Sequence, residues 1–89
     1  MADKQHILLV DDDPNISHLV RLYLEKEGFG VTECDRGDTA IDAFRSCNPA
    51  LVLLDVMLPG KDGLEVLKEI RMTSKVPVIM LTAKDETFD

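Results

Sequence analysis

The stretch Leu51-Val52-Leu53-Leu54-Asp55-Val56-Met57-Leu58-Pro59-Gly60-Lys61-Asp62-Gly63 decides the fold of this chain. With Ala50 before it, its apolar start is too short for a helix and is typical of a strand buried on both faces of a sheet. Asp55 follows this run directly, and residues 59–63 are rich in turn-forming glycine, proline and aspartate. The stretch therefore predicts a buried strand that ends in a carboxylate and leads into a turn.

Further strand and helix patterns surround this stretch. Strands are expected at residues 6–10, 29–34, 50–54 and 76–81, and helices at residues 14–27, 38–47 and 64–72. Asp13 and Pro14 suit the start of the first helix and Gly28 suits its end, while Asp38 and Asn48 suit the two ends of the second. Because strands and helices alternate, the order predicts a parallel sheet with right-handed crossovers and helices on both faces.

Composition and charge exclude several classes of protein. The chain has 89 residues, 45% of them hydrophobic and 30% charged, which predicts one globular domain. Its net charge of −7 argues against binding to a nucleic-acid backbone or an anionic membrane surface. No apolar run is long enough to span a membrane and no signal peptide is evident, so we expect a cytoplasmic protein. Cys34 and Cys47 form no metal-binding motif with the two histidines, which favours reduced thiols.

Polar residues follow three of the predicted strands at their carboxyl ends. Asp11, Asp12 and Asp13 follow the first strand, Asp55 follows the third, and Thr82 follows the fourth. Parallel strands present these ends at one edge of the sheet, and right-handed crossovers place the first and third strands side by side. We therefore expect Asp12 and Asp55 to face each other across a small crevice.

This arrangement of carboxylates indicates a cation and a phosphate. Neighbouring carboxylates repel one another unless a cation neutralises them, and Mg²⁺ prefers such ligands while it keeps waters that phosphate oxygens can replace. A carboxylate can also attack phosphorus and form an acyl phosphate. The pattern thus predicts metal-assisted phosphorylation of an aspartate, with the Thr82 hydroxyl donating to a phosphoryl oxygen.

Simpler roles are open for each residue taken alone. The aspartates at 11–13 could cap the first helix, Asp55 could be an ordinary polar residue at a strand end, and Thr82 could simply end its strand. A different class is a phosphohydrolase of the haloacid dehalogenase type, because residues 7–13 fit an apolar strand followed by D-x-D. Pro14, the short chain and the lack of a role for Asp55 argue against that class.

Three stretches of the chain resemble the receiver domain of two-component response regulators. They are residues 7–14, 51–64 and 77–83, and the similarity runs through residues 5–85. The most specific part is the aspartate followed by the Met-Leu-Pro-Gly-x-x-Gly turn. The resemblance implies a flavodoxin-like three-layer α/β/α fold with the strand order 2-1-3-4. The run Ile-Met-Leu-Thr-Ala-Lys is similar to the winged-helix, DNA-binding regulators, so regulation of transcription is the implied output.

The resemblance also implies a role for each metal-site residue. Asp55 is implied as the phosphoacceptor and as a ligand of Mg²⁺ or Mn²⁺. Asp12 is implied as a direct ligand, and Asp11 as an acidic neighbour that acts through water. The backbone carbonyl of Met57 completes the implied ligand set.

Phosphoryl binding and the phosphoryl donor follow from the same resemblance. Thr82 is implied as the switch hydroxyl that binds the phosphoryl group, beside the backbone N–H of Ala83. The implied donor is the phosphohistidine of a sensor histidine kinase. The chain would then be a signalling module in a phosphorelay rather than an enzyme.

The chain departs from the receiver pattern at its end. Receivers carry a lysine after a fifth strand and an aromatic switch residue on it, whereas this chain ends at Asp89, and Lys84 does not qualify as that lysine. We therefore expect a C-terminally truncated receiver that lacks the fifth strand and the last helices and is phosphorylated poorly. An uncovered edge at residues 76–81, or the outer face of helix 14–27, favours a homodimer or an exchanged assembly. The alternative is a self-assembling or complementation fragment without phosphotransfer activity.

Overall fold

The computed structural model describes residues 5–81 of the chain. These residues form β1 (His6–Val10), α1 (Pro14–Lys26), β2 (Gly30–Cys34), α2 (Ala40–Cys47), β3 (Leu51–Asp55), α3 (Gly63–Thr73) and β4 (Val78–Leu81). The strands form one parallel sheet in the order β2-β1-β3-β4. The predicted parallel sheet and its strand order are thus confirmed.

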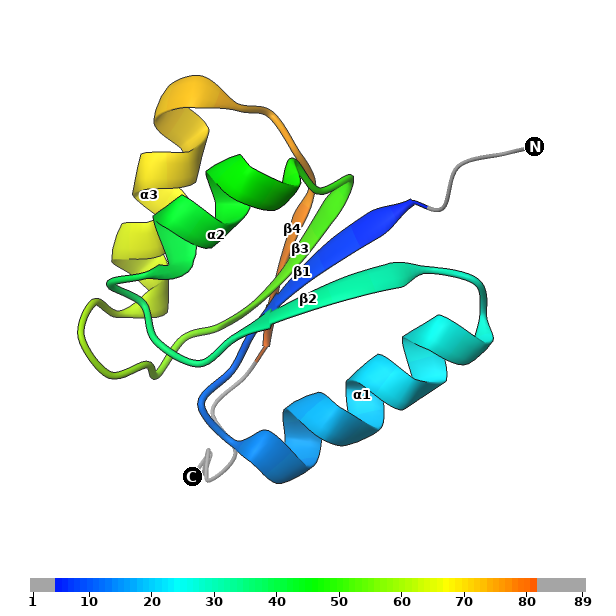
Figure 1. Cartoon of the computed structure of the whole chain (residues 1–89). Helices are drawn as coiled ribbons and strands as arrows, with labels where there is room; N and C mark the ends of the chain where they lie inside the picture. Colours follow the sequence, from blue (N-terminus) through cyan, green and yellow to red (C-terminus); the bar gives the residue numbers. More distant parts are fainter. Residues whose placement is uncertain (1–4, 82–89) are drawn as a thin grey trace, which may run out of the picture.

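The elements form three layers, with α2 and α3 on one face of the sheet and α1 on the other (Figure 1). The main core lies under α2 and α3, and its buried members are Leu8, Val10, Ala40, Phe44, Val52, Leu54, Val66 and Ile70. Phe44 is the sole aromatic member, so this core is mainly aliphatic. Burial of these side chains is the main force that holds the helices on the sheet and keeps the strand ends in place.

Helix α1 begins and ends where local sequence signals place it. The Asp13 carboxylate accepts a hydrogen bond of 3.0 Å from the Asn15 N–H, and Pro14 is the first helical residue. The helix ends at Lys26, before Gly28 with a φ of +97°, a conformation that L side chains rarely adopt. Phe29 does not join β2, because its N–H donates to the Leu24 carbonyl instead.

Helix α2 begins later than predicted. Asp38 does not cap it, because the Arg36 guanidinium holds the Asp38 carboxylate in two hydrogen bonds of 2.8 and 2.9 Å. The N-cap is Thr39, and its side chain makes no capping hydrogen bond. The predicted end is observed, with Asn48 in the left-handed region at a φ of +46°.

Strand β4 is shorter than predicted and starts at Val78 rather than at residue 76. Proline has no N–H to offer at position 77, and the Val76 N–H donates to the Ser74 hydroxyl at 3.1 Å instead of joining a ladder. Helix α3 starts one residue before its predicted range, because the Asp62 carboxylate caps it by accepting from the Glu65 N–H at 3.0 Å. These shifts leave the order of elements unchanged.

Apolar side chains remain exposed on α1 and β4. Leu19, Leu22 and Tyr23 of α1 are 69%, 51% and 66% exposed, and Ile79 of β4 is 52% exposed. Within residues 5–81, β4 pairs with β3 alone and so forms an edge of the sheet. No helix in this described part is long and apolar enough to cross a membrane.

Candidate functional site

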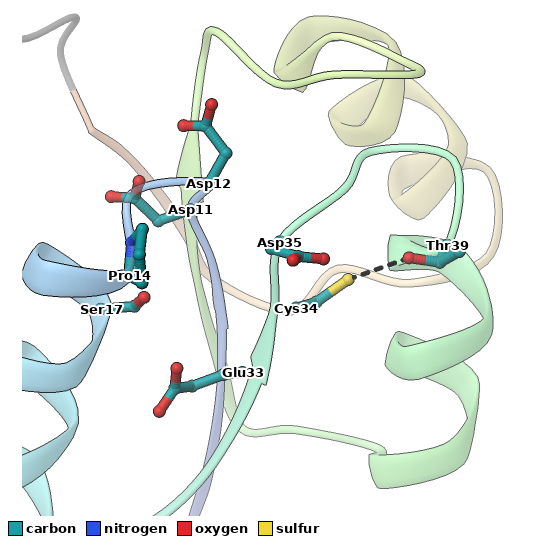
Figure 2. A pocket seen from close by; sticks show the side chains of 8 residues that line it. All are labelled: Asp11, Asp12, Pro14, Ser17, Glu33, Cys34, Asp35 and Thr39. Atoms are coloured by element: carbon teal, nitrogen blue, oxygen red, sulfur yellow. Dashed lines mark hydrogen bonds between the residues drawn. The ribbon is translucent and has the colours of Figure 1, made fainter.

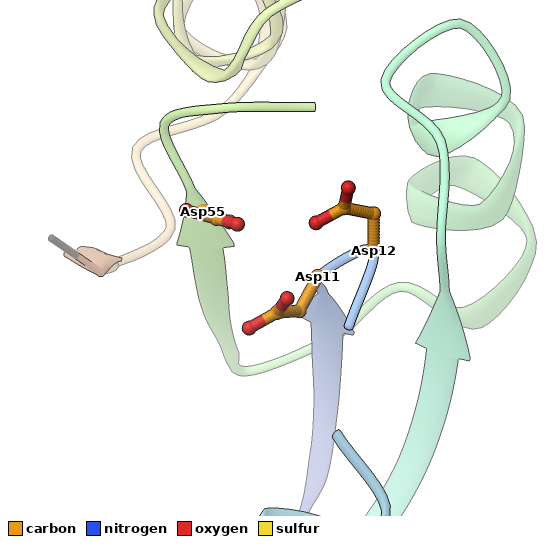
Figure 3. A group of neighbouring side chains, drawn as sticks. All are labelled: Asp11, Asp12 and Asp55. Carbon is orange, nitrogen blue, oxygen red and sulfur yellow. The ribbon is translucent and has the colours of Figure 1, made fainter. Parts of the chain in front are cut away.

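Three aspartates meet where β1 and β3 end. The two strands are parallel neighbours with Val10 opposite Leu54, so their carboxyl ends, with Asp55 as the last residue of β3, lie side by side. Carboxylate oxygens of Asp11, Asp12 and Asp55 all lie within 4.8 Å of one another (Figure 3). The structure therefore brings together the aspartates that the strand order places at one edge of the sheet.

The three carboxylates differ in burial and in local hydrogen bonds. Asp11 and Asp55 are only 5% and 2% exposed, whereas Asp12 is open to solvent. The Asp11 carboxylate accepts from the Asp13 N–H at 2.9 Å, and the Asp55 carboxylate accepts from the Met57 N–H at 3.4 Å. The carboxylates of Asp11 and Asp55 are thus anchored to the loops that follow them, and the carboxylate of Asp12 faces solvent.

The donor set of this cluster fits a hard divalent cation. Two unit charges within 4.8 Å of each other repel by about 3.5 kcal/mol or more at an effective dielectric constant of about 20. A cation among the three carboxylates removes this repulsion and replaces it with attraction. Oxygen donors are the ligands that Mg²⁺ takes, and it is commonly held by one or two carboxylates while several positions stay with water.

Two hollows adjoin the cluster, and Asp12 lines both. The first lies between the start of α1 and the end of β2 (Figure 2), and its lining comprises Asp11, Asp12, Pro14, Ser17, Glu33, Cys34, Asp35 and Thr39. The second is lined by Asp12, Met57, Leu58, Pro59 and Asp62. The cluster is therefore reachable from solvent on the side of Asp12.

The turn after β3 packs directly against the backbone of Asp55. The Gly63 N–H donates to the Val56 carbonyl at 2.8 Å, and a Cβ atom at Gly63 would lie 2.1 Å from the Asp55 carbonyl oxygen. The sequence pattern identified the glycine at 63 as a turn former, but its close approach to β3 carries no local sequence signal. Gly63 therefore sets how tightly α3 is placed beside the acidic cluster.

Charged side chains around the site pair with one another. Asp38 accepts hydrogen bonds from Arg36, and this pairing lowers the pKa of Asp38 below its ordinary value. Lys61 pairs with Glu69 of α3, and that hydrogen bond raises the pKa of Lys61. Cys47, further from the cluster, has a pKa raised by burial.

The residues implied by the receiver resemblance stand in different positions relative to the cluster. Thr82 and Ala83 lie outside the described residues. The last described residue, Leu81, pairs in register with Asp55 at the edge where the aspartates meet. Met57 lies beside the cluster through its N–H contact with Asp55, while its side chain is 61% exposed.

Comparison with known sequences gives one consistent family. The family described as the response regulator receiver domain matches residues 7–89. The transcriptional regulatory protein CseB of Streptomyces coelicolor is 46% identical over 89 residues, which are 100% of this chain and 38% of that protein. ResD of Bacillus subtilis is 49% identical over 85 residues, 96% of this chain and 35% of that protein. The chain thus spans little more than a third of the length of these curated relatives.

Solved structures agree with this comparison. The BeF3-activated receiver domain of Klebsiella pneumoniae RstA has a TM-score of 0.87 and 39% identity, covering 92% of this chain and 70% of that one. The response regulator TrrA of Thermotoga maritima, in complex with Mg²⁺-BeF, has a TM-score of 0.83 and 43% identity. The match covers 91% of this chain and 71% of that one. TrrA in complex with the histidine kinase ThkA has a TM-score of 0.81 and 41% identity. The match covers 96% of this chain and 74% of that one.

Proposed function

The chain belongs to the family of response regulator receiver domains of two-component signalling, and from this we propose that it accepts a phosphoryl group on Asp55. The acidic cluster carries the proposal, because oxygens of Asp11, Asp12 and Asp55 lie within 4.8 Å of one another. Asp55 stands at the very end of β3 and is 2% exposed, so it is held rigidly by the core below it. A rigid carboxylate beside two others suits metal-assisted attack on phosphorus.

The proposed cofactor is Mg²⁺, or Mn²⁺ in its place. We assign Asp12, Asp55 and the backbone carbonyl of Met57 as direct ligands and Asp11 as a ligand through water. The exposure of Asp12 supports this assignment, as does the position of Met57 next to the Asp55 carboxylate. When bound, the cation supplies positive charge that neutralises both the carboxylates and the phosphoryl oxygens. TrrA, solved in complex with Mg²⁺-BeF, is a related precedent.

The proposed reaction moves a phosphoryl group from a sensor histidine kinase to this chain. An Asp55 oxygen attacks phosphorus, so an O–P bond forms while the N–P bond of the kinase phosphohistidine breaks. The electron pair stays on the imidazole nitrogen, which takes up a proton from water. Thr82 and the Ala83 N–H are assigned to the phosphoryl oxygens from the family resemblance. A histidine kinase is the proposed partner, and the relative TrrA has been solved in complex with one.

The proposed output is regulation of transcription. CseB and ResD are transcriptional regulatory proteins by name, and MtrA of Mycolicibacterium smegmatis is a DNA-binding response regulator. The net charge of −7 supports a regulatory rather than a DNA-binding role for this segment. DNA binding is accordingly assigned to a part of the whole protein other than these residues.

Self-association is a second proposal, and a separate observation favours it. The outer face of α1 exposes Leu19, Leu22 and Tyr23, and β4, the edge strand within residues 5–81, exposes Ile79. An apolar strand edge is a template for pairing with another chain. We propose that a second copy of the chain covers one of these surfaces. Assembly without phosphorylation would instead identify a self-assembling or complementation fragment.

The phosphohydrolase alternative is disfavoured by the position of Asp13. That mechanism needs Asp13 as an acid and base, but its carboxylate caps α1 by accepting from the Asn15 N–H at 3.0 Å. It also leaves Asp55 without a role, although Asp55 is buried in the cluster. Turnover of a generic phosphomonoester separates the two functions: a receiver takes one phosphoryl group, whereas a hydrolase turns over many.

The proposed function is tested by incubation with acetyl phosphate and Mg²⁺, followed by intact-mass measurement. The unmodified chain should gain the mass of one phosphoryl group, and the gain should vanish when EDTA replaces Mg²⁺. Asp55→Asn, which keeps the shape of the side chain, should gain nothing. An equal mass gain in Asp55→Asn would refute Asp55 as the acceptor.

A further inference from the structure

We propose that Gly37 is a positioning residue for the metal site, because its missing side chain lets two loops interlock beside the aspartates. The first loop joins β2 to α2 (residues 35–39), and the second joins β3 to α3 (residues 56–62). The inference rests on the proposed function, since it concerns the same cation site. It adds a residue that touches neither the cation nor the phosphoryl group.

The contact at Gly37 is between backbone and backbone. Gly37 is buried, and its N–H donates to the Pro59 carbonyl at 3.0 Å. A Cβ atom on Gly37 would lie 1.5 Å from the carbonyl oxygen of Lys61 and 2.6 Å from its carbonyl carbon. No change of rotamer relieves such a clash, because the atoms that are met belong to the main chain. Any larger residue must displace the second loop.

The second loop meets the first in the same way. Gly60 has a φ of +86°, and a Cβ atom there would lie 2.6 Å from Cγ of Asp38. The Asp38 carboxylate pairs with Arg36 but is exposed, so the stricter requirement for glycine at position 60 is its positive φ. Two glycines, one in each loop, therefore leave the space in which the loops interlock.

This interlock joins the loops that follow β2 and β3, and the end of β2 is in turn hydrogen-bonded to Asp11 at the end of β1. The first loop follows Cys34, whose carbonyl accepts from the Asp11 N–H at 3.0 Å. The second loop follows Asp55 directly, and its Met57 N–H donates to the Asp55 carboxylate. The contact between Gly37 and Pro59 thus closes a ring from Asp11 through both loops to Asp55.

Displacement of the second loop reaches the site by a short path. Met57 lies two residues before Pro59, so a displacement of residues 59–61 also shifts the backbone of Met57. Mg²⁺ demands near-ideal octahedral geometry, so a shift of a backbone carbonyl ligand weakens its binding. A residue larger than glycine at position 37 should therefore weaken cation binding, although it lies outside the ligand set.

The test compares two equal substitutions at opposite ends of the sheet. Gly37→Ala is the test variant, and Gly30→Ala is its control, since a Cβ atom at Gly30 would lie 2.7 Å from Nδ1 of His6. The Kd for Mg²⁺ is measured by NMR titration of the folded protein, and the melting temperature of each variant is recorded. Gly37→Ala should raise the Kd roughly tenfold or more, as loss of a supporting residue around a metal does. Gly30→Ala should lower the melting temperature without changing the Kd.

A second measurement needs no variant and decides the matter if Gly37→Ala does not fold. If the interlock supports cation binding, cation binding must support the interlock to the same extent. Mg²⁺ should therefore slow hydrogen exchange at the Gly37 N–H of the unmodified chain. Unchanged exchange there, or an unchanged Kd in folded Gly37→Ala, would overturn the role of Gly37 alone. Failure of the unmodified chain both to bind Mg²⁺ and to be phosphorylated would overturn the proposed function itself.

Discussion

A carboxylate oxygen of Asp12 lies within 4.8 Å of a carboxylate oxygen of Asp55, although Asp12 follows β1 and Asp55 ends β3. The closeness follows from the parallel pairing of β1 with β3, which brings both carboxyl ends to one edge of the sheet. The core beneath these strands is buried, so the backbones that carry the aspartates are held close together. The fold therefore holds like charges together, and a cation bound among them would relieve this repulsion.

Removal of one of these charges should stabilise the protein when no divalent cation is present. Asp12→Asn keeps the shape of the side chain and removes its charge, so we expect the free energy of unfolding to rise by roughly 1 kcal/mol, part of the repulsion being screened by solvent. Urea denaturation in EDTA measures this change. Saturating Mg²⁺ should reverse the order, because the unmodified chain gains about 2.7 kcal/mol at 100 times its Kd. A variant that is less stable than the unmodified chain in EDTA would contradict the repulsion argument.

Truncation of the core should be far more damaging than truncation on the outer face of α1. Leu8 is fully buried, so Leu8→Ala should lower the free energy of unfolding by about 2–5 kcal/mol. Leu19 is 69% exposed, so Leu19→Ala should change it by no more than about 0.5 kcal/mol. Chemical denaturation of both variants makes the comparison, and equal losses would show that α1 packs differently.

The ion pair between Arg36 and Asp38 should be visible in the pH dependence of Asp38. Hydrogen bonding to Arg36 lowers the pKa of Asp38 from the ordinary value of 3.8. Because the folded pKa is the lower one, the pair stabilises the protein above pH 3.8, and this contribution is lost as the pH falls through the folded pKa. NMR titration should give a midpoint below the ordinary value, and Arg36→Ala should restore it. An unaltered midpoint in Arg36→Ala would show that Arg36 does not hold the carboxylate in solution.

Self-association should depend on concentration and on one exposed surface. Sedimentation at several concentrations should show a dimer that dissociates on dilution. Ile79→Lys places a charge on the edge strand and should prevent pairing there, whereas a charge at Leu19 should prevent contact through α1. A monomer at every concentration, with a single sharp melting transition, would refute the proposed assembly.

Much of the fold could be predicted because its signals are local. The apolar run before Asp55 is continuous, the helices carry capping residues such as Asp13, and Gly28 ends α1 as expected. The strand order itself came from the family resemblance, and the structure confirms it. The predicted start of α2 at residue 38 was wrong. Asp38 can either cap a helix or pair with Arg36, and the sequence alone does not show which interaction forms.

The supporting contacts of the site could not be predicted. Gly37 contacts Pro59 and Lys61, which are distant in sequence, so no spacing rule marks it. Gly63 could be identified as a turn former, but its approach to the Asp55 backbone depends on how α3 packs. Residues that carry the chemistry follow strand ends and are visible in a sequence, whereas residues that hold them in place depend on tertiary packing.

The central claim is that Asp55 receives the phosphoryl group, and site mapping tests it most directly. The chain is incubated with a phosphorylated histidine kinase and Mg²⁺, and the acyl phosphate is then reduced with borohydride and located by peptide mass spectrometry. We predict that the modification lies on Asp55, is absent without Mg²⁺, and does not move to Asp11 or Asp12 in Asp55→Asn. Modification of any other residue in the unmodified chain would contradict the account.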